Sequence, residues 1–540
     1  MKARVVIFGL DGATFTVLDD LMRRGVMPNL AEFLASGASG HLLSTVPPLT
    51  PPAWTTLFTG RSPGHHGITN FLQFESETSK YIRVVTSREV RCPTILALAS
   101  QAGLRAGALN LIAHNPAPKL NGYVVPGWVT WRWIRQYSHP EGFLDSLRER
   151  LPELDIKNLG MDFSEERKAI QGATLTDYEP WIDLHIRRER QWFGILRHQM
   201  VHDPSSIEAI VFDGVDKLQH LCWPYLDPAL EPAQPSDAFL RIRNKCWDYF
   251  RQIDGFLKET VQLAGRDAHV FVVSDHGFCG SNEVLYINNW LEQEGFLTWS
   301  ANTAVQSEDS AELGRARPYH LTFFDLARTK AFAVLASTNG INIQVKGVKG
   351  PDGIEPSQYE GFRAELIDAL LTRCVDPTTG DPIVRRVWTR EEAFAGPSMN
   401  LASDLTLELR DFGFFSVLRG GSVLKKRPVV MGTHHPEGVL GVCGPGVRRG
   451  ARLNALHLLD IAPTALYLLG LPIPDDLEGR IGTEIFSDGF LHSRKAIPGH
   501  ATESTQSVGD EQLSAVAGAY QDAEEEEQIM MRLRALGYLE

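Results

Sequence analysis

Short continuous runs of apolar residues recur along this chain, and several of them end in an acidic residue. Three runs have this form: Val5–Leu10 before Asp11, Ile210–Phe212 before Asp213, and Val270–Val273 before Ser274-Asp275. A strand that is buried on both faces of a parallel sheet has this continuous apolar pattern. Because ligands bind beyond the carboxyl ends of strands in open α/β sheets, the acidic strand ends predict a site at one sheet edge.

Two further residue pairs strengthen this prediction to different degrees. Asp275 and His276 are adjacent, so two side chains that can bind a metal ion follow one strand, whereas a lone Asp there is usually a turn or cap residue. Asp216 and His220 are four residues apart and would share one face of a helix, where they could bind one ion. The spacing of this second pair suits an ordinary surface pair equally well.

A helix is expected to begin at Thr50, in the segment Leu49–Gly60. Thr is a favoured N-cap residue, and Pro51 and Pro52 are tolerated in the first turn. A simple helix cap is one interpretation of Thr50. The other is a nucleophile, because the helix dipole and amides stabilise an alkoxide and an adjacent anion, and a neighbouring metal ion would complete the activation.

The stretch from Thr50 to Ile68 closely resembles the nucleophile segment of the type I phosphodiesterase and nucleotide pyrophosphatase family, in the alkaline phosphatase superfamily. Other segments resemble the family's landmarks in the family's order: Asp11-Gly12, Asp216–His220, Ser274–Gly277, Gly432–His434, Asp460–Thr464 and Leu477–Arg480. The resemblance covers about residues 1–490. It implies an α/β fold with an alkaline-phosphatase-like core, in which a mostly parallel central sheet has helices on both faces and carries inserted cap elements.

The resemblance also implies two divalent metal ions, with zinc expected and manganese or iron compatible with the same ligands. One ion would be held by Asp216, His220 and His434, and the other by Asp11, Asp275, His276 and the Thr50 hydroxyl. Thr50 would attack phosphorus and form a phospho-threonine intermediate that water then hydrolyses. His434 is chosen over His435 because of the family's Gly-x-His spacing, and His65 and His66 are interpreted as supporting residues.

Two features depart from the family pattern. The family often has Phe-Pro-Asn-His after the nucleophile, where this chain has Pro51-Pro52-Ala53-Trp54, so the pocket wall beside Thr50 differs. Asn70 is predicted to bind a phosphoryl oxygen of the substrate, although it lies one residue earlier than the family pattern predicts. An ordinary turn Asn is the alternative.

The sequence therefore predicts a metal-dependent phosphohydrolase, most simply a phosphodiesterase or nucleotide pyrophosphatase that acts on a small phosphate ester or nucleotide. The alternatives are a phosphomonoesterase, a phosphonate hydrolase and a cofactor-independent phosphosugar mutase. A sulfatase is disfavoured, because it needs Cys or Ser with a nearby Arg, whereas this chain has Thr50 and no Arg before Arg61 in that segment. A non-catalytic binding protein is disfavoured because all seven ligand positions carry competent residues.

Composition limits the partners and the compartment. The chain has 53 Lys and Arg against 66 Asp and Glu, a formal charge of −13, which argues against general nucleic-acid binding. No apolar stretch approaches the roughly 20 residues that a membrane-spanning helix needs. Residues 1–4 lead directly into the first strand with no room for a signal peptide, and the six cysteines contain no Cys-x-x-Cys pair. A cytoplasmic protein is expected.

We expect one catalytic domain over residues 1–490, with a cap insertion at about 115–200 and a second insertion at about 300–400. The aromatic residues of the first insertion could pack in its core or line a substrate entrance: Trp128, Trp131, Trp133, Tyr137 and Trp181. Residues 491–522 read as a flexible linker. Residues 523–540 read as an amphipathic helix that docks on the body or on another subunit of a homo-oligomer, or as a solvated acidic tail.

Overall fold

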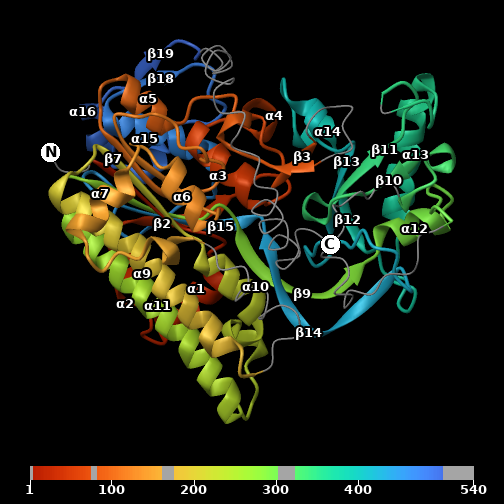
Figure 1. Ribbon diagram of the computed structural model, residues 1–540, viewed down its shortest axis with the longest axis horizontal. Helices are drawn as coiled ribbons and strands as arrows, with labels where there is room; N and C mark the ends of the chain where they lie inside the picture. The colour runs from red at the N-terminus through yellow and green to blue at the C-terminus, as the bar shows by residue number, and fades with distance from the viewer. Residues whose placement is uncertain (1–3, 75–81, 161–174, 302–322, 349, 503–540) are drawn as a thin grey trace.

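The chain forms two lobes joined by a long two-stranded ribbon, as Figure 1 shows for the computed structural model. The structure describes residues 4–74, 82–160, 175–301, 323–348 and 350–502. The predicted C-terminal helix at 523–540 and most of the predicted linker lie outside these residues. Before residue 503 the linker segment contains the end of α16 (Asp488–Ser493) and β19 (Ile497–Gly499), which pairs with β18 (Pro472–Pro474).

The larger lobe is built on a central sheet that has nine strands within the described residues. Its strands follow the order β16-β2-β15-β8-β1-β7-β5-β6, with β17 beside β2. Their bounds are β1 Val5–Leu10, β2 Ala38–Leu43, β5 Ala106–Leu111, β6 Gly122–Pro126, β7 Ile207–Phe212, β8 His269–Val273, β15 Glu437–Cys443, β16 Ala451–Arg452 and β17 Leu456–His457. Every pairing is parallel except those of β15 with β2 and β8, so the predicted mostly parallel sheet is confirmed.

The three predicted strands that end in acid are neighbours in this sheet. β1 lies between β7 and β8, and all residues of the three strands are buried, which explains their continuous apolar sequences. Leu10 pairs with Phe212, and Gly9 pairs with Val273. This register brings the three strand ends, and the acidic residues that follow them, to the same edge.

Helices cover both faces of the central sheet (Figure 1), which confirms the predicted layers. One face carries α2 (Pro28–Ser36), α9 (Tyr178–His202) and α11 (Asp237–Ala264), and the other carries α3 (Thr50–Thr59), α5 (Ile95–Gln101) and α15 (Ile461–Leu469). Further helices are α1 (Phe15–Arg23), α4 (Pro63–His66), α6 (Trp131–Tyr137), α7 (Phe143–Arg150) and α10 (Gly214–Leu226). A short hairpin of β3 (Leu72–Phe74) and β4 (Ile82–Val84) follows α4.

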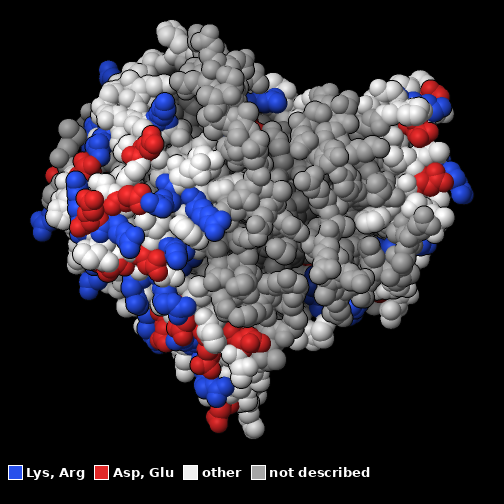
Figure 2. All heavy atoms as spheres, in the orientation of Figure 1, with Lys and Arg blue, Asp and Glu red and all other residues white. Residues whose placement is uncertain are grey.

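The long helices α9 and α11 pack side by side and are joined by ion pairs, such as Arg241 with Glu179 and Lys245 with Asp183. Figure 2 shows positive and negative side chains intermingled over the described surface of these helices. Across the described ranges, no helix is both long enough and apolar enough to cross a membrane.

The segment that the sequence predicts as a cap contributes to the body of the larger lobe. β6 is the edge strand of the central sheet, and α9 packs against α11. Three of its aromatic residues, Trp128, Trp133 and Trp181, are buried in the core of this lobe. These side chains are therefore core residues, and a covering role of this segment over the site stays a prediction.

The smaller lobe has its own hydrophobic core, which draws on residues from Leu285 to Val417. It contains the antiparallel sheet β10-β11-β13-β12, whose strands are Ala331–Phe332, Gly340–Ile343, Leu405–Leu409 and Val384–Thr389. Helices α12 (Ile287–Gln293), α13 (Tyr359–Thr372) and α14 (Arg390–Ala393) complete it. The ribbon of β9 (Gly277–Leu285) and β14 (Leu424–His435) connects this lobe to the central sheet.

Candidate metal centre

The seven side chains predicted as metal ligands lie together at the edge of the central sheet where β1, β7 and β8 end. Each of them is exposed by 8% or less. They come from elements that are far apart in the sequence: Asp11 follows β1, Thr50 begins α3, Asp216 and His220 lie on α10, Asp275 and His276 follow β8, and His434 lies on β14. The predicted convergence is therefore observed, whereas the role of each residue is a matter of proposal.

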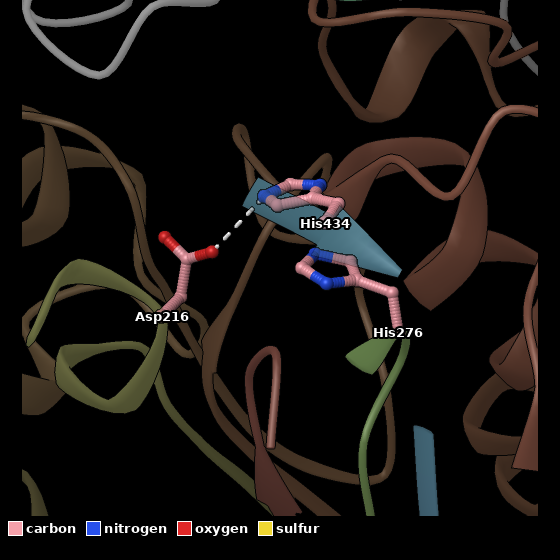
Figure 3. Close-up of side chains that lie close together, drawn as sticks. All are labelled: Asp216, His276 and His434. Atoms are coloured by element: carbon pink, nitrogen blue, oxygen red, sulfur yellow. Dashed lines mark ion pairs between the residues drawn. The ribbon is translucent and has the colours of Figure 1, made fainter. Parts of the chain in front are cut away.

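One group consists of Asp216, His220 and His434. Asp216 Oδ1 lies 3.2 Å from His434 Nε2 and 3.4 Å from His220 Nε2, and the two Nε2 atoms are 3.1 Å apart. Figure 3 shows the Asp216 carboxylate pointing at the His434 ring. Asp216 and His220 lie on one face of α10, as their four-residue spacing predicts.

The second group surrounds His276. Its Nε2 atom lies 3.3 Å from Asp275 Oδ2, 3.7 Å from Asp11 Oδ1 and 3.3 Å from the Thr50 hydroxyl. The rings of His276 and His434 are stacked, with centroids 3.6 Å apart, so the two groups adjoin each other. In each of two sets of three residues, Asp216-His276-His434 and Asp11-Asp275-His276, the ligand atoms all lie within 4.8 Å of one another. His276 is therefore within reach of both groups.

Backbone carbonyls orient the three imidazoles. The Nδ1 atoms of His220, His276 and His434 lie 3.1, 3.1 and 2.8 Å from the carbonyls of Gly432, Gly277 and Pro48, respectively. Because a carbonyl can only accept, each Nδ1 carries the proton and donates. In the neutral rings each Nε2 therefore presents a lone pair to the centre, which is the arrangement of a metal-binding histidine.

Two of the carboxylates, those of Asp11 and Asp275, have a hydrogen-bond donor on one oxygen only. Trp54 Nε1 donates to Asp11 Oδ2 at 3.2 Å, and the backbone N–H of Gly12 donates to Asp275 Oδ1 at 3.0 Å. Within the part of the chain that is described, no hydrogen bond reaches Asp11 Oδ1, Asp275 Oδ2 or either Asp216 oxygen. Buried carboxylate oxygens are costly without a partner, and a cation bound among them would satisfy them.

Burial is the largest influence on the pKa values of these side chains. Burial, followed by the charges of Asp275 and Asp216, raises the pKa of Asp11 well above its ordinary value. Burial also raises the pKa of Asp275 and lowers that of His276. For Asp216, burial acts upward but the imidazoles of His220 and His434 outweigh it, and its pKa falls. Buried carboxylates beside imidazoles form a mixed oxygen and nitrogen donor set that fits a pair of divalent cations.

Thr50 is the first residue of α3, as expected, and the N-cap is Leu49, so the interpretation of Thr50 as a simple helix cap is wrong. The reason lies in the two prolines: Pro51 and Pro52 have no N–H group, and the next one, on Ala53, donates to the Leu49 carbonyl at 2.9 Å. The hydroxyl of Thr50 is therefore not used as a cap and faces His276. The same prolines remove two of the amides that were expected to bind an anion there.

The remaining predicted residues lie at different places. Asn70 is buried, and its Oδ1 accepts hydrogen bonds from Ser337 Oγ at 2.8 Å and from the N–H of Phe71 at 2.7 Å, so it links the two lobes. Its contact with a substrate stays a prediction. His66 is hydrogen-bonded to Thr56 Oγ1 at 3.0 Å, and burial lowers its pKa to about 3. The ring of His435 packs on Phe412 on the other side of β14 from His434.

Three side chains around the centre were not identified as supporting residues from the sequence. Trp54 holds Asp11, and its position one helical turn after Thr50 was the available signal. Gln219 donates to the Gly12 carbonyl at 2.7 Å, next to Asp11. The ring of Phe278 lies 4.8 Å from that of His220 and 5.2 Å from that of His434, measured between centroids, so one side of the centre is apolar.

Comparison with known proteins places the chain in a family. The profile described as type I phosphodiesterase / nucleotide pyrophosphatase matches residues 5–436. Murine ectonucleotide pyrophosphatase / phosphodiesterase 5 is a similar solved structure, with a TM-score of 0.49 and 13% sequence identity over 90% of this chain and 100% of that chain. Phosphonoacetate hydrolase from Sinorhizobium meliloti 1021, in complex with phosphonoacetate, is similar with a TM-score of 0.48 and 16% identity over 87% and 95%. Because the family match extends over most of the chain and spans all seven predicted ligands, this protein belongs to the type I phosphodiesterase / nucleotide pyrophosphatase family of phosphoester hydrolases, in the alkaline phosphatase superfamily.

Proposed function

We propose that this protein cleaves a phosphodiester or nucleotide pyrophosphate bond in two steps, with Thr50 as the nucleophile and zinc as the bound metal. The observation that carries the proposal is the position of the Thr50 hydroxyl. It is fully buried at the first residue of α3, lies 3.3 Å from His276 Nε2, and does not cap its own helix. A hydroxyl that only stabilised the helix would be used as a cap.

The residues of the centre have separate tasks in this reaction. Because His276 donates from Nδ1 to the Gly277 carbonyl, its Nε2 lone pair faces the Thr50 hydroxyl, and an ion bound by this nitrogen would lie beside that oxygen. The dipole of α3 favours the anionic form of that oxygen. Two divalent ions held by the seven residues would supply the positive charge that stabilises the attacking and leaving oxygens. The Thr50 hydroxyl loses its proton to solvent, its oxygen bonds to phosphorus, and the leaving oxygen departs with the electron pair of the broken P–O bond. Water then hydrolyses the phospho-threonine, which releases the phosphoryl group and returns the hydroxyl to Thr50.

We assign Asn70 to the substrate through its amide group. Its Oδ1 is occupied by Ser337 and by the N–H of Phe71, so Nδ2 is the end that can donate to a phosphoryl oxygen. The preference for a diester or pyrophosphate over a phosphomonoester rests on family membership.

The substrate class is tested with bis(4-nitrophenyl) phosphate and 4-nitrophenyl phosphate, after the purified protein has been loaded with Zn²⁺ or Mn²⁺. We expect a higher kcat/KM for the diester. A higher value for the monoester would overturn the diester assignment, and inactivity on both substrates with metal bound at both sites would overturn the proposed function.

The nucleophile is tested by Thr50→Ala, which we expect to lower kcat by about 10⁴-fold or more. Thr55→Ala is the matched control, because Thr55 lies on the same helix, is also buried, and its hydroxyl donates to the Pro51 carbonyl at 2.7 Å. The control should keep most of its turnover. Trapping of a phosphorylated protein in the wild type and not in Thr50→Ala would support the intermediate, whereas turnover by folded Thr50→Ala would show that another group attacks.

A further inference from the structure

The aspartate at the end of β7, Asp213, lies at the same sheet edge as the metal centre but has partners of its own. Its Oδ1 accepts hydrogen bonds from the Arg188 guanidinium and, at 3.0 Å, from Asn110 Nδ2. Its Oδ2 lies 2.7 Å from the Lys217 ammonium group. All four side chains are buried. Two protein cations thus compensate this carboxylate, which removes it as a competing metal ligand.

Glu189, the residue after Arg188, binds Gly214, the residue after Asp213. Glu189 Oε1 accepts the backbone N–H of Gly214, the first residue of α10, at 2.8 Å. A carboxylate is favourable at the N-terminus of a helix, where the amides have no intrahelical partner. A Cβ atom at Gly214 would lie 2.7 Å from this oxygen and 2.5 Å from the hydroxyl of Tyr249, so only glycine permits the approach.

Two consecutive residues of α9 therefore hold two consecutive residues at the start of α10. Arg188 also donates from Nε to the Leu159 carbonyl at 3.1 Å, which anchors its guanidinium on a third segment. The predicted ligands Asp216 and His220 follow on the first two turns of α10. Any rotation of that first turn would move both of them relative to His434.

We propose that Arg188 and Glu189 are positioning residues for the metal centre: they fix the start of α10 and thereby set the affinity of Asp216, His220 and His434 for their ion. This inference rests on the proposed metal-dependent function. It also gives α9, which lies within the insertion at 115–200, a task in the reaction without any contact to the substrate.

The test is Zn²⁺ binding by the full chain, measured by competition with a chromophoric chelator, together with thermal unfolding. Arg188→Met should weaken one of the zinc sites by about 10- to 100-fold, the usual effect of removing a residue that orients metal ligands. Arg188→Lys keeps the charge but cannot reach Asp213 and Leu159 together, so it should fall between the wild type and Arg188→Met. Gly214→Ala leaves every charge in place, displaces the start of α10 from Glu189, and should also weaken that site.

Glu208→Gln is the matched control. Glu208 is a buried carboxyl on β7, the strand that ends at Asp213, but it lies near the opposite end of that strand, where Tyr123 and Ser205 donate hydrogen bonds to it. This variant should leave the zinc affinity unchanged. Unchanged zinc affinity in folded Arg188→Met would overturn the proposal. If that variant does not fold, unchanged affinity in both Arg188→Lys and Gly214→Ala would do so. A wild-type protein that binds no zinc would instead count against the proposed function.

Discussion

Two sets of carboxylates lie at the same edge of the central sheet and are compensated in opposite ways. Asp213 forms ion pairs with Arg188 and Lys217. Asp11 and Asp275 are equally buried, yet among the described residues their only ion-pair partner is His276, whose pKa burial lowers. The protein thus supplies its own cations where the carboxylate is structural, and it leaves the charge open where an external cation would bind.

Of the changes that test this comparison, removal of the metal should have the largest effect, and that effect should be on turnover. Treatment with a chelator should lower turnover by at least about 10³-fold, because charge stabilisation supplies most of the catalysis of phosphoryl transfer. Added Zn²⁺ should restore it, and circular dichroism should show that the fold, including the Asp213 cluster, persists throughout. Full activity in protein shown to be metal-free by elemental analysis would contradict the prediction.

Neutralising Asp213 should destabilise the protein, whereas neutralising Asp275 should not. In metal-free protein, Asp213→Asn should reduce the free energy of unfolding by about 3–5 kcal/mol, because it leaves two buried cations without their partner. Asp275→Asn should be neutral or stabilising, because it removes a buried charge that no protein cation compensates. Urea unfolding measures the free energy of unfolding of both variants. Equal destabilisation would show that the two carboxylates are not compensated differently. Saturating Zn²⁺ should stabilise the wild type and not Asp275→Asn.

A smaller effect should appear in the pH dependence of stability. Burial, followed by the charge of Asp213, raises the pKa of Glu189 from 4.5 to about 7. A raised pKa means that the folded protein binds the proton more tightly than the unfolded chain, so this contribution is present below about pH 4.5 and is lost as the pH rises through about 7. Between pH 5 and 8, Glu189→Gln should therefore gain up to about 3 kcal/mol relative to the wild type. Parallel stability curves from urea unfolding would show that Glu189 does not titrate in this range.

The parts of the structure that were predictable are those that local sequence determines. Val5–Leu10 was predicted residue for residue as β1, because a strand buried on both faces needs a continuous apolar run. The family resemblance gave the order of the ligands, and the family match confirms that resemblance. The helix start at Thr50 followed from the two prolines after it, although the same prolines moved the N-cap to Leu49.

The parts that were not predictable depend on contacts between distant segments. Asp213 and Asp216 are both acidic and three residues apart. Lys217 is close to both in sequence, and its ion pair with Asp213, like that of Arg188 from a remote helix, is seen only in the structure. The hydrogen bond between Asn70 and Ser337 crosses from one lobe to the other over 267 residues. Neither contact leaves a periodic signal, because each joins one side chain to one partner.

The ribbon of β9 and β14 has a consequence for how this architecture can vary. The chain leaves the centre just after His276 and returns to it at His434, and these two ends are held in antiparallel register, with His434 opposite Phe278. At the far end Leu285 pairs with Leu424, so residues 286–423 enter and exit as a single hairpin insertion. A lobe attached in this way can differ in size while both histidines keep their spacing, since the base of the ribbon fixes the distance between these two residues.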